Sequence, residues 1–317
     1  MATDCAPETF TAADGATLTA CAHGGHVLGW TPAGGRPRLW LSPRAECGPG
    51  LAIRGGIPVI FPQFADRGPL PKHGLARNRG WLVTAGAPAP RDGLQDGSGR
   101  AGIPDRPTAG QAPADTAHPA DTAHRTDTAH RDDAVHWQAV LTEDAQTLAI
   151  WPHHFELTLS ARAGGDRLDL GLTVRNRGDE AWPFTAALHT YLALGDPGTL
   201  ILGLGGWSAA DNARSGRPTT LGRSGEPLVA TEARDVAVTG FDRPLLLQDP
   251  VLGPLTITAE GFPDRVIWNP GSDAGLNDVP AQTERDFVCI EPAALSPILL
   301  KPGAIWNGHQ TLRASVP

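Results

Sequence analysis

The sequence of 317 residues lacks several features that would assign it to a common class of protein. Its cysteines form no CxxC pair, so we expect reduced thiols rather than a disulfide framework or a zinc site. They stand at Cys5, Cys21, Cys47 and Cys289. Positive charge is not in excess either, because the formal net charge is −8 at pH 7. We therefore expect no general attraction to nucleic acid or to an anionic membrane surface, and any anion site must be local.

Targeting segments and common catalytic motifs are also missing. The first twenty residues, MATDCAPETFTAADGATLTA, lack the basic start and apolar run of a signal peptide. No apolar run approaches membrane-spanning length. We therefore expect a soluble cytoplasmic protein. A nucleophile elbow, a P-loop, an HExxH motif and a GxGxxG motif before a helix are all absent, so covalent acyl chemistry and nucleotide-dependent chemistry have no visible machinery.

What the chain does contain is the material of an all-β protein. It has 38 glycines, 30 prolines and 40% hydrophobic residues, which favours many turns around a substantial core. Apolar and polar residues alternate on both sides of Gly164–Asp166, which predicts a β-hairpin over residues 155–174. Similar hairpins are predicted over 243–261 and over 26–42, the second turning at Gly34 and Gly35. With no convincing long helix, we expect large antiparallel sheets in a single domain spanning residues 1–317.

One segment, residues 87–133, does not fit this pattern. It has almost no large apolar residues and cannot offset the entropy of ordering, so we expect a disordered insertion. Asp-Thr-Ala-His recurs within it, ending at His118, His124 and His130, with a degenerate copy ending at His136. A metal-binding tract is one interpretation of the repeat. We favour a disordered surface insertion because nothing rigid would fix ligand geometry. The flanking segments GWLVTAG and VHWQAVLTED are expected to pair as one hairpin.

Cations gather in a segment rich in proline and glycine. The stretch RGGIPVIFPQF begins at Arg54, and LPKHGLARNRGW follows it closely with Lys72, His73 and Arg77. Prolines fix backbone angles and glycines allow unusual ones, so such a segment can hold side chains in place without regular structure. The sequence therefore predicts a local anion site here. Pairing of these cations with surface carboxylates is the alternative.

Three further positions have side chains suited to acid–base or sugar chemistry. His189 lies in the apolar run FTAALHTYLALGD and is the best general acid available near neutral pH. Glu291 follows the run FVCI, and we expect Pro292 to end that strand. Trp268 and Asn269 end another apparent strand, where an indole face and an amide could contact a sugar. Core packing is the alternative for His189 and Trp268.

Five segments, in this order, resemble the aldose 1-epimerase superfamily, and more narrowly its glucose-6-phosphate 1-epimerase branch. They are AIRGGIPVIFPQF, LPKHGLARNRGW, ALHTYLALGD, VIWNPG and FVCIEPA. The resemblance implies a β-supersandwich of the galactose mutarotase type, with few short helices. It implies His189 as general acid on the ring oxygen and Glu291 as general base on the anomeric hydroxyl. No metal or other cofactor is implied.

The same resemblance suggests the substrate contacts. It implies that Arg54 and Arg77 lie near the sugar and its phosphate, and it leaves Lys72 as a departure from the family's usual residue. The family's substrate-binding aspartate best matches Asp211, in a segment with weak local similarity. If His189 and Glu291 are close, we expect each to favour the charged form of the other.

These observations predict an isomerase that interconverts the α and β anomers of a hexose 6-phosphate. An epimerase for unphosphorylated aldoses and a non-catalytic carbohydrate-binding protein are the alternatives. The partner is then a small molecule rather than nucleic acid or a membrane, and we expect a monomer.

Overall fold

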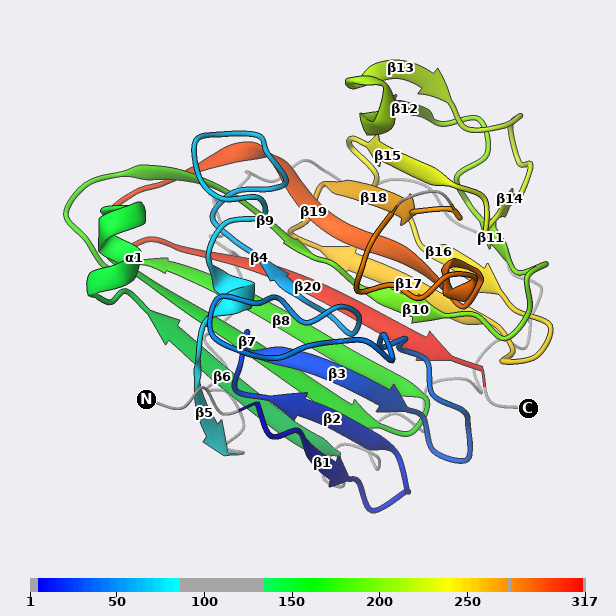
Figure 1. Cartoon of the computed structure of the whole chain (residues 1–317), viewed down its shortest axis with the longest axis horizontal. Coiled ribbons are helices and arrows are strands. Elements are labelled where there is room, and N and C mark those ends of the chain that lie inside the picture. The colour runs from blue at the N-terminus through cyan, green and yellow to red at the C-terminus, as the bar shows by residue number, and fades with distance from the viewer. Residues whose placement is uncertain (1–4, 86–133, 273–274, 316–317) are drawn as a thin grey trace, which may run out of the picture.

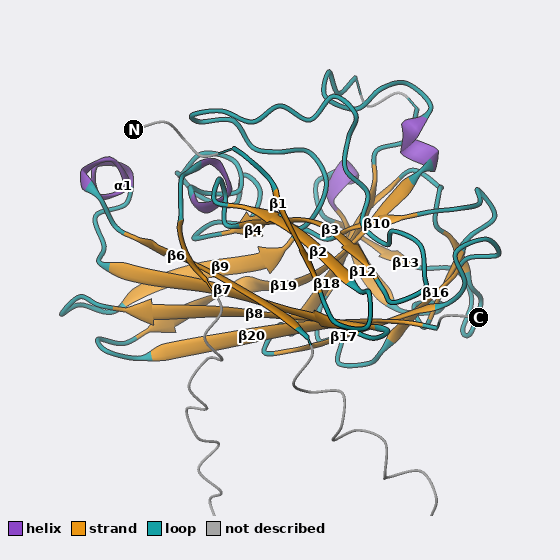
Figure 2. Ribbon diagram, turned by 90° about the horizontal axis from the view of Figure 1, so that it is seen from below, coloured by secondary structure: helices purple, strands orange, loops and turns teal. Residues whose placement is uncertain are grey.

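The computed structural model describes residues 5–85, 134–272 and 275–315. The strands there form two stacked layers, with β9, β18 and β19 above β7, β8 and β20 (Figure 2). The β1–β3 sheet is formed by the N-terminal part of the chain and lies in front of β6 and β7 in Figure 1. The predicted insertion at residues 87–133 and its three histidines at positions 118, 124 and 130 lie outside the described residues. Among the described residues, no helix has the length and apolar character needed to cross a membrane.

Antiparallel pairing connects the described strands into three sheets. The small sheet has the order β1 (Glu8–Thr11), β2 (Thr17–Cys21), β3 (His26–Thr31). The second has the order β13 (Arg217–Thr220), β12 (Ser208–Asp211), β15 (Arg234–Val238), β18 (Asp264–Asn269), β19 (Phe287–Leu300), β9 (Trp182–Leu188), β4 (Val59–Ile60), with β10 (Tyr191–Ala193) also paired to β19. The third has the order β14 (Leu228–Val229), β11 (Leu200–Leu202), β16 (Leu245–Gln248), β17 (Leu255–Glu260), β20 (Ile305–Ala314), β8 (Arg167–Asn176), β7 (Phe155–Gly164), β6 (Val135–Thr142), β5 (Leu82–Ala85).

The alternation seen in the sequence builds the core face of the third sheet. Every second residue of β7, from Phe155 to Ala163, is buried, and the residues between them are partly exposed. β8 pairs with β7 along its whole length after a turn in which Gly165 has φ +57°. Each large apolar side chain buried in this way contributes about 1.5–3 kcal/mol. The predicted hairpin over 155–174 is therefore confirmed.

Two other predicted hairpins are also confirmed. β16 pairs with β17 inside the 243–261 segment. β5 pairs with β6 across the insertion, with Ala85 opposite Trp137. The prediction of few helices holds as well for the described residues. They form one short α-helix, α1 (Ala145–Ile150), and three single turns, η1 (Ala76–Asn78), η2 (Asn212–Arg214) and η3 (Thr283–Arg285).

Two strand predictions were wrong. The segment after Gly34 does not return as a partner strand of β3, which pairs instead with β2. Residues 38–42 are held by single bridges, including Leu41 to Gly55, because this segment crosses toward the second sheet. Pro292 does not end its strand, since β19 runs on to Leu300. Glu291 therefore lies within a long strand rather than at its end.

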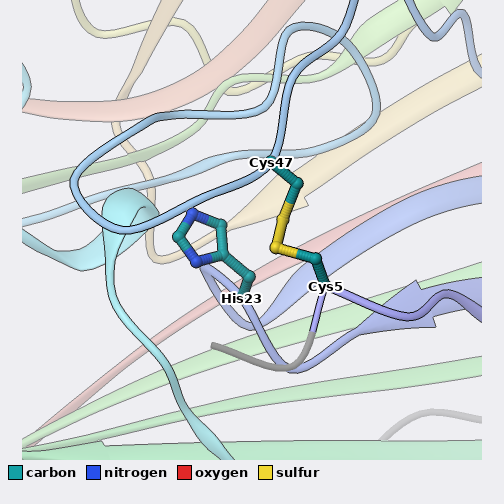
Figure 3. Close-up of side chains that lie close together, drawn as sticks. All are labelled: Cys5, His23 and Cys47. Carbon is teal, nitrogen blue, oxygen red and sulfur yellow. A yellow bond between two sulfur atoms is a disulfide. The ribbon is translucent and has the colours of Figure 1, made fainter. Parts of the chain in front are cut away.

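The prediction of reduced cysteines was wrong for one pair. Cys5 and Cys47 form a disulfide with their Cα atoms 5.9 Å apart, close to the ring of His23 (Figure 3). The sequence separation of 42 residues hid the pair, because the chain folds back through the small sheet before it reaches Cys47. Cys21 and Cys289 are buried and lie outside this disulfide.

This disulfide generates a prediction about stability. We expect Cys47→Ser to lower the free energy of unfolding by about 2–4 kcal/mol, because a crosslink of this separation restricts the unfolded chain. Urea denaturation without a reducing agent measures the loss, and Cys5→Ser should give the same value. An unchanged midpoint in both variants would show that the pair does not crosslink the chain in solution.

Candidate active site

The two predicted acid–base residues meet because their strands are neighbours. β9 pairs antiparallel with β19, with Ala187 opposite Ala293. His189 comes two residues after Ala187, and Glu291 comes two residues before Ala293. In an antiparallel pair these displacements run in the same direction, so both side chains arrive at one place. His189 Nε2 lies 3.3 Å from Glu291 Oε1.

This pair is almost completely removed from water. His189 is 6% exposed and Glu291 is 1% exposed. The other polar atoms of the pair, His189 Nδ1 and Glu291 Oε2, have no hydrogen-bond partner in the described part of the chain. The His189 ring stacks on Tyr191 with centroids 4.8 Å apart and an angle of 10°. Trp268 meets the same ring edge-on at 5.8 Å. Two aromatic rings therefore fix the orientation of the imidazole.

Burial shifts the pKa values of both groups in the directions opposite to our expectation. It lowers the pKa of the His189 imidazole well below its usual range. Neighbouring His73, Arg77 and Arg54 act in the same direction. It also raises the pKa of the Glu291 carboxyl well above its usual range, and Asp235 raises it further while Arg77 opposes this. Burial therefore disfavours the charged form of each group, because charge is costly at this depth.

Close packing of the backbone places Arg54 beside this pair. The glycines after it lie against neighbouring backbone, since a Cβ on Gly56 would come within 2.4 Å of the Val27 carbonyl oxygen. Arg54 Nε donates to Asp278 Oδ2 at 2.9 Å, and Nη1 donates to the Tyr191 hydroxyl at 2.9 Å. The guanidinium is thus held by two partners distant in sequence, and its side chain remains 22% exposed.

The segment that ends in η1 supplies the three other residues of the predicted anion site, which are Lys72, His73 and Arg77. His73 is buried, its backbone has φ +66°, and its ring lies 5.7 Å from the His189 ring. The Ala65 N–H donates to His73 Nδ1 at 3.3 Å. Burial and three nearby cations lower the pKa of His73 to about 3, so this imidazole is neutral. Arg77 Nη2 donates to the Lys72 carbonyl at 3.3 Å, and the Lys72 side chain is exposed.

A cavity of about 600 Å³ adjoins the acid–base pair at Trp268, which lines it. Its lining includes four of the predicted substrate residues: Lys72, Asp211, Trp268 and Asn269. Asp211 ends β12 and lies 3.6 Å from Arg214 Nε. The Asn269 amide is used within the protein, because Nδ2 donates to the carbonyls of Glu284 and Phe287 while Oδ1 accepts from the Gly271 N–H.

The structure therefore brings the predicted residues together in two adjoining groups. The first group has five residues: the acid–base pair His189 and Glu291, with Arg54, His73 and Arg77 around it. The other four line the cavity. Trp268 joins the two groups, because it lines the cavity and its ring contacts the His189 ring.

Sequence reasoning missed three residues that organise this site. Tyr191 holds both the His189 ring and Arg54, and its spacing of two from His189 could have indicated a shared face. Asp278 anchors Arg54 from 224 positions away, for which the sequence offers no signal. Asp235 lines the cavity and raises the Glu291 pKa, and it lies on β15 directly opposite Trp268 on β18.

The sequence matches the family model described as aldose 1-epimerase over residues 8–94 and 124–313. The chain belongs to the aldose 1-epimerase family. The gap in this match, residues 95–123, falls inside the predicted insertion. A "Putative glucose-6-phosphate 1-epimerase" of Cenchrus ciliaris is 31% identical over 301 residues, covering 92% of this chain and 79% of the relative. A protein of the same name from Escherichia coli K12 is 27% identical, covering 86% of this chain and 78% of the relative.

Solved structures show the same fold. A structure described as a "putative mutarotase" from Salmonella typhimurium matches with a TM-score of 0.73 and 22% identity, covering 95% of this chain and 88% of the other. The Slr1438 protein of Synechocystis matches with a TM-score of 0.69 and 22% identity, covering 99% and 98%. The predicted all-β fold of the galactose mutarotase type is therefore confirmed.

The shifted pKa of Glu291 predicts a pH-dependent effect on stability. Because the folded-state pKa lies above the unfolded value, Glu291 destabilises the fold progressively as pH rises above about 4.3. Gln cannot ionise, so Glu291→Gln should unfold with a higher free energy than the wild type, and this difference should grow from pH 5 to pH 8. Urea denaturation at both pH values measures it.

Glu232→Gln is the matched control, because Glu232 pairs with Arg234 at an exposed position. The stability of Glu291→Gln should rise relative to this control between pH 5 and pH 8. A Glu291→Gln difference that shrinks as pH rises would contradict a raised pKa for Glu291.

Proposed function

We propose that this protein interconverts the α and β anomers of a hexose 6-phosphate. The observation that supports this most directly is the buried contact between His189 Nε2 and Glu291 Oε1, at 3.3 Å, beside Arg54 and Arg77. The names of its relatives point to the same substrate class. Acid–base chemistry on a sugar anion requires this combination of a proton-carrying pair and nearby fixed cations.

The reaction needs two proton transfers at oxygens bonded to one carbon. A base removes the proton of the anomeric hydroxyl while an acid delivers a proton to the ring oxygen, and the bond between the anomeric carbon and the ring oxygen breaks. The aldehyde formed rotates by half a turn, and the reverse transfers close the ring. Two groups in mutual contact can serve both oxygens because those oxygens are neighbours on the same carbon.

The protonation of the pair suits this exchange. A neutral imidazole and a neutral carboxyl hold the same number of protons as an imidazolium and a carboxylate, so one transfer from Glu291 to His189 gives the acid and base that we assign. Arg54 and Arg77 oppose charge on His189 in the resting site. A bound phosphate would offset both cations and so favour the imidazolium. His189 then acts as general acid on the ring oxygen, and Glu291 acts as general base on the anomeric hydroxyl.

We assign the phosphate to the cations of the proline-rich loop and Arg54. The Arg54 guanidinium is oriented by Asp278 and Tyr191, and the exposed Lys72 ammonium lines the adjoining cavity. Trp268 and Asp211 line the same cavity and would contact the sugar by its C–H face and its hydroxyls. Asn269 has its amide engaged by backbone groups, so we give it the role of holding Trp268 in place.

An epimerase for unphosphorylated aldoses is the nearer alternative, and it leaves the cations without a role. A non-catalytic carbohydrate-binding protein is the other, and it leaves the buried acid–base pair without a role. Anomer exchange of glucose 6-phosphate and of glucose, measured side by side by NMR, separates the three. Catalysis of the phosphorylated sugar alone supports our proposal. Binding with no faster exchange of either sugar contradicts it.

The single domain, the monomeric state and the cytoplasmic location remain predictions. The Cys5–Cys47 disulfide weighs against the last of these, because disulfides persist in oxidising compartments and are rare in the cytosol.

The acid–base roles predict the behaviour of two variants. His189→Ala and Glu291→Gln should each lower kcat for anomer exchange at least about a hundredfold, the lower range for loss of a general acid or base. Polarimetry or NMR exchange measures the rate, and circular dichroism confirms folding. A folded variant with a near-normal rate would remove that residue from the mechanism.

The phosphate assignment predicts a substrate-dependent effect of Lys72. Lys72→Ala should raise KM for glucose 6-phosphate roughly tenfold or more, because a hydrogen bond to a charged group contributes about 1.5–3 kcal/mol. Any residual exchange of glucose should not change. Lys301→Ala is the matched control, since Lys301 is exposed beyond the end of β19. Equal effects of Lys72→Ala on both sugars would place Lys72 away from the phosphate.

A further inference from the structure

The proposed chemistry leaves one buried nucleophile at the site without a role. Cys289 is free and fully buried, and it lies on β19 two residues before Glu291. A spacing of two places both side chains on the same face of the strand. Cys289 also lies opposite Tyr191 of β10 and Trp268 of β18 in the sheet, the two aromatic residues that contact the His189 ring.

These three side chains offer a cluster of metal-ligating atoms. The Cys289 Sγ, a ring nitrogen of His189 and a carboxylate oxygen of Glu291 all lie within 4.8 Å of one another. Zinc bonds of about 2.0–2.2 Å to nitrogen and oxygen at tetrahedral angles separate those ligand atoms by roughly 3.4 Å. The observed separation of His189 Nε2 and Glu291 Oε1 is 3.3 Å. The pair is already spaced as two corners of a tetrahedral zinc site.

An unused polar atom makes the same place attractive to a cation. Glu291 Oε2 is buried and has no hydrogen-bond partner among the described residues. A carboxylate oxygen left in this state is costly, and a cation bound by both oxygens of the carboxylate lowers that cost. Sulfur, imidazole and carboxylate together form a donor set that zinc accepts.

We propose that Cys289, His189 and Glu291 form an inhibitory Zn²⁺ site that overlaps the anomerisation site. The cation takes the place of the proton shared by His189 and Glu291, and both this proton and the Cys289 thiol proton leave to solvent as the metal binds. The thiolate and the carboxylate offset the two charges of the metal, which counters the repulsion from Arg54 and Arg77. With both proton carriers bound to the metal, neither is free to act on a sugar, so zinc and hexose 6-phosphate exclude each other. The inhibitory part rests on the proposed function, whereas the site itself does not.

The test uses the full chain and separates binding from inhibition. Histidines at positions 118, 124 and 130 can bind metal without sulfur, so the readout must be specific for thiolate. Cobalt(II) bound to a thiolate absorbs in the near ultraviolet by charge transfer from sulfur. Titration with Co²⁺ should give this band in the wild type and in Cys21→Ser, the matched control at the other buried cysteine outside the disulfide. The band should be absent in Cys289→Ser and should disappear when Zn²⁺ is added to the wild type.

Inhibition is measured in the anomer-exchange assay. Zn²⁺ should compete with glucose 6-phosphate, and both Cys289→Ser and Cys289→Ala should raise its inhibition constant at least tenfold while the rate without zinc is unchanged. Two substitutions are used in case one of them fails to fold. No charge-transfer band, a band that survives in the folded Cys289 variants, or an unchanged inhibition constant would each overturn the proposal. If the chain proves not to be an epimerase, the cobalt band still decides whether the site exists.

Discussion

The site depends on one contact, in which an imidazole and a carboxyl face each other in a place nearly closed to water. The pairing of β9 with β19 makes this contact, because it brings residues about a hundred positions apart in the chain to adjacent places in one sheet. Burial then disfavours charge on both groups, since an isolated charge of either sign would be poorly solvated. The proposed proton exchange on a hemiacetal relies on this contact between two groups that can each carry a proton.

The surrounding residues act mainly by fixing this contact and limiting its charge. Tyr191 connects the acid–base pair to Arg54, because its ring stacks on His189 while its hydroxyl accepts a hydrogen bond from Arg54. Asp278 anchors the same arginine from the other side. A guanidinium held by two partners is already oriented before an anion arrives, so less entropy is lost on binding. Arg54 and Arg77 therefore act on the pair through their electrostatic field, which lowers the pKa of His189.

Much of the fold and the central pair could be predicted from the sequence, because the signals are local. Period-two alternation and turn glycines identify hairpins such as β7–β8, and the ordered motifs identify His189, Glu291 and Arg54. The predictions that failed depend on contacts between distant parts of the chain. Cys5 finds Cys47 only because the chain folds back, and β19 continues through Pro292 in spite of the residue that should end it. The directions of the two pKa shifts were also not expected, because depth of burial cannot be deduced from the order of residues.

The burial of the pair bears on both proposed ligands, the sugar phosphate and zinc. Glu291 Oε2 is buried without a hydrogen-bond partner among the described residues, which is costly until a ligand engages the carboxylate. A sugar does this with hydroxyls, and a soft cation does it by direct coordination. Arg54 and Arg77 distinguish the two, because they attract a phosphate ester and repel a metal ion. Cys289 shifts that balance back toward the metal, since its sulfur adds a third ligand where a residue without a donor atom would leave only two.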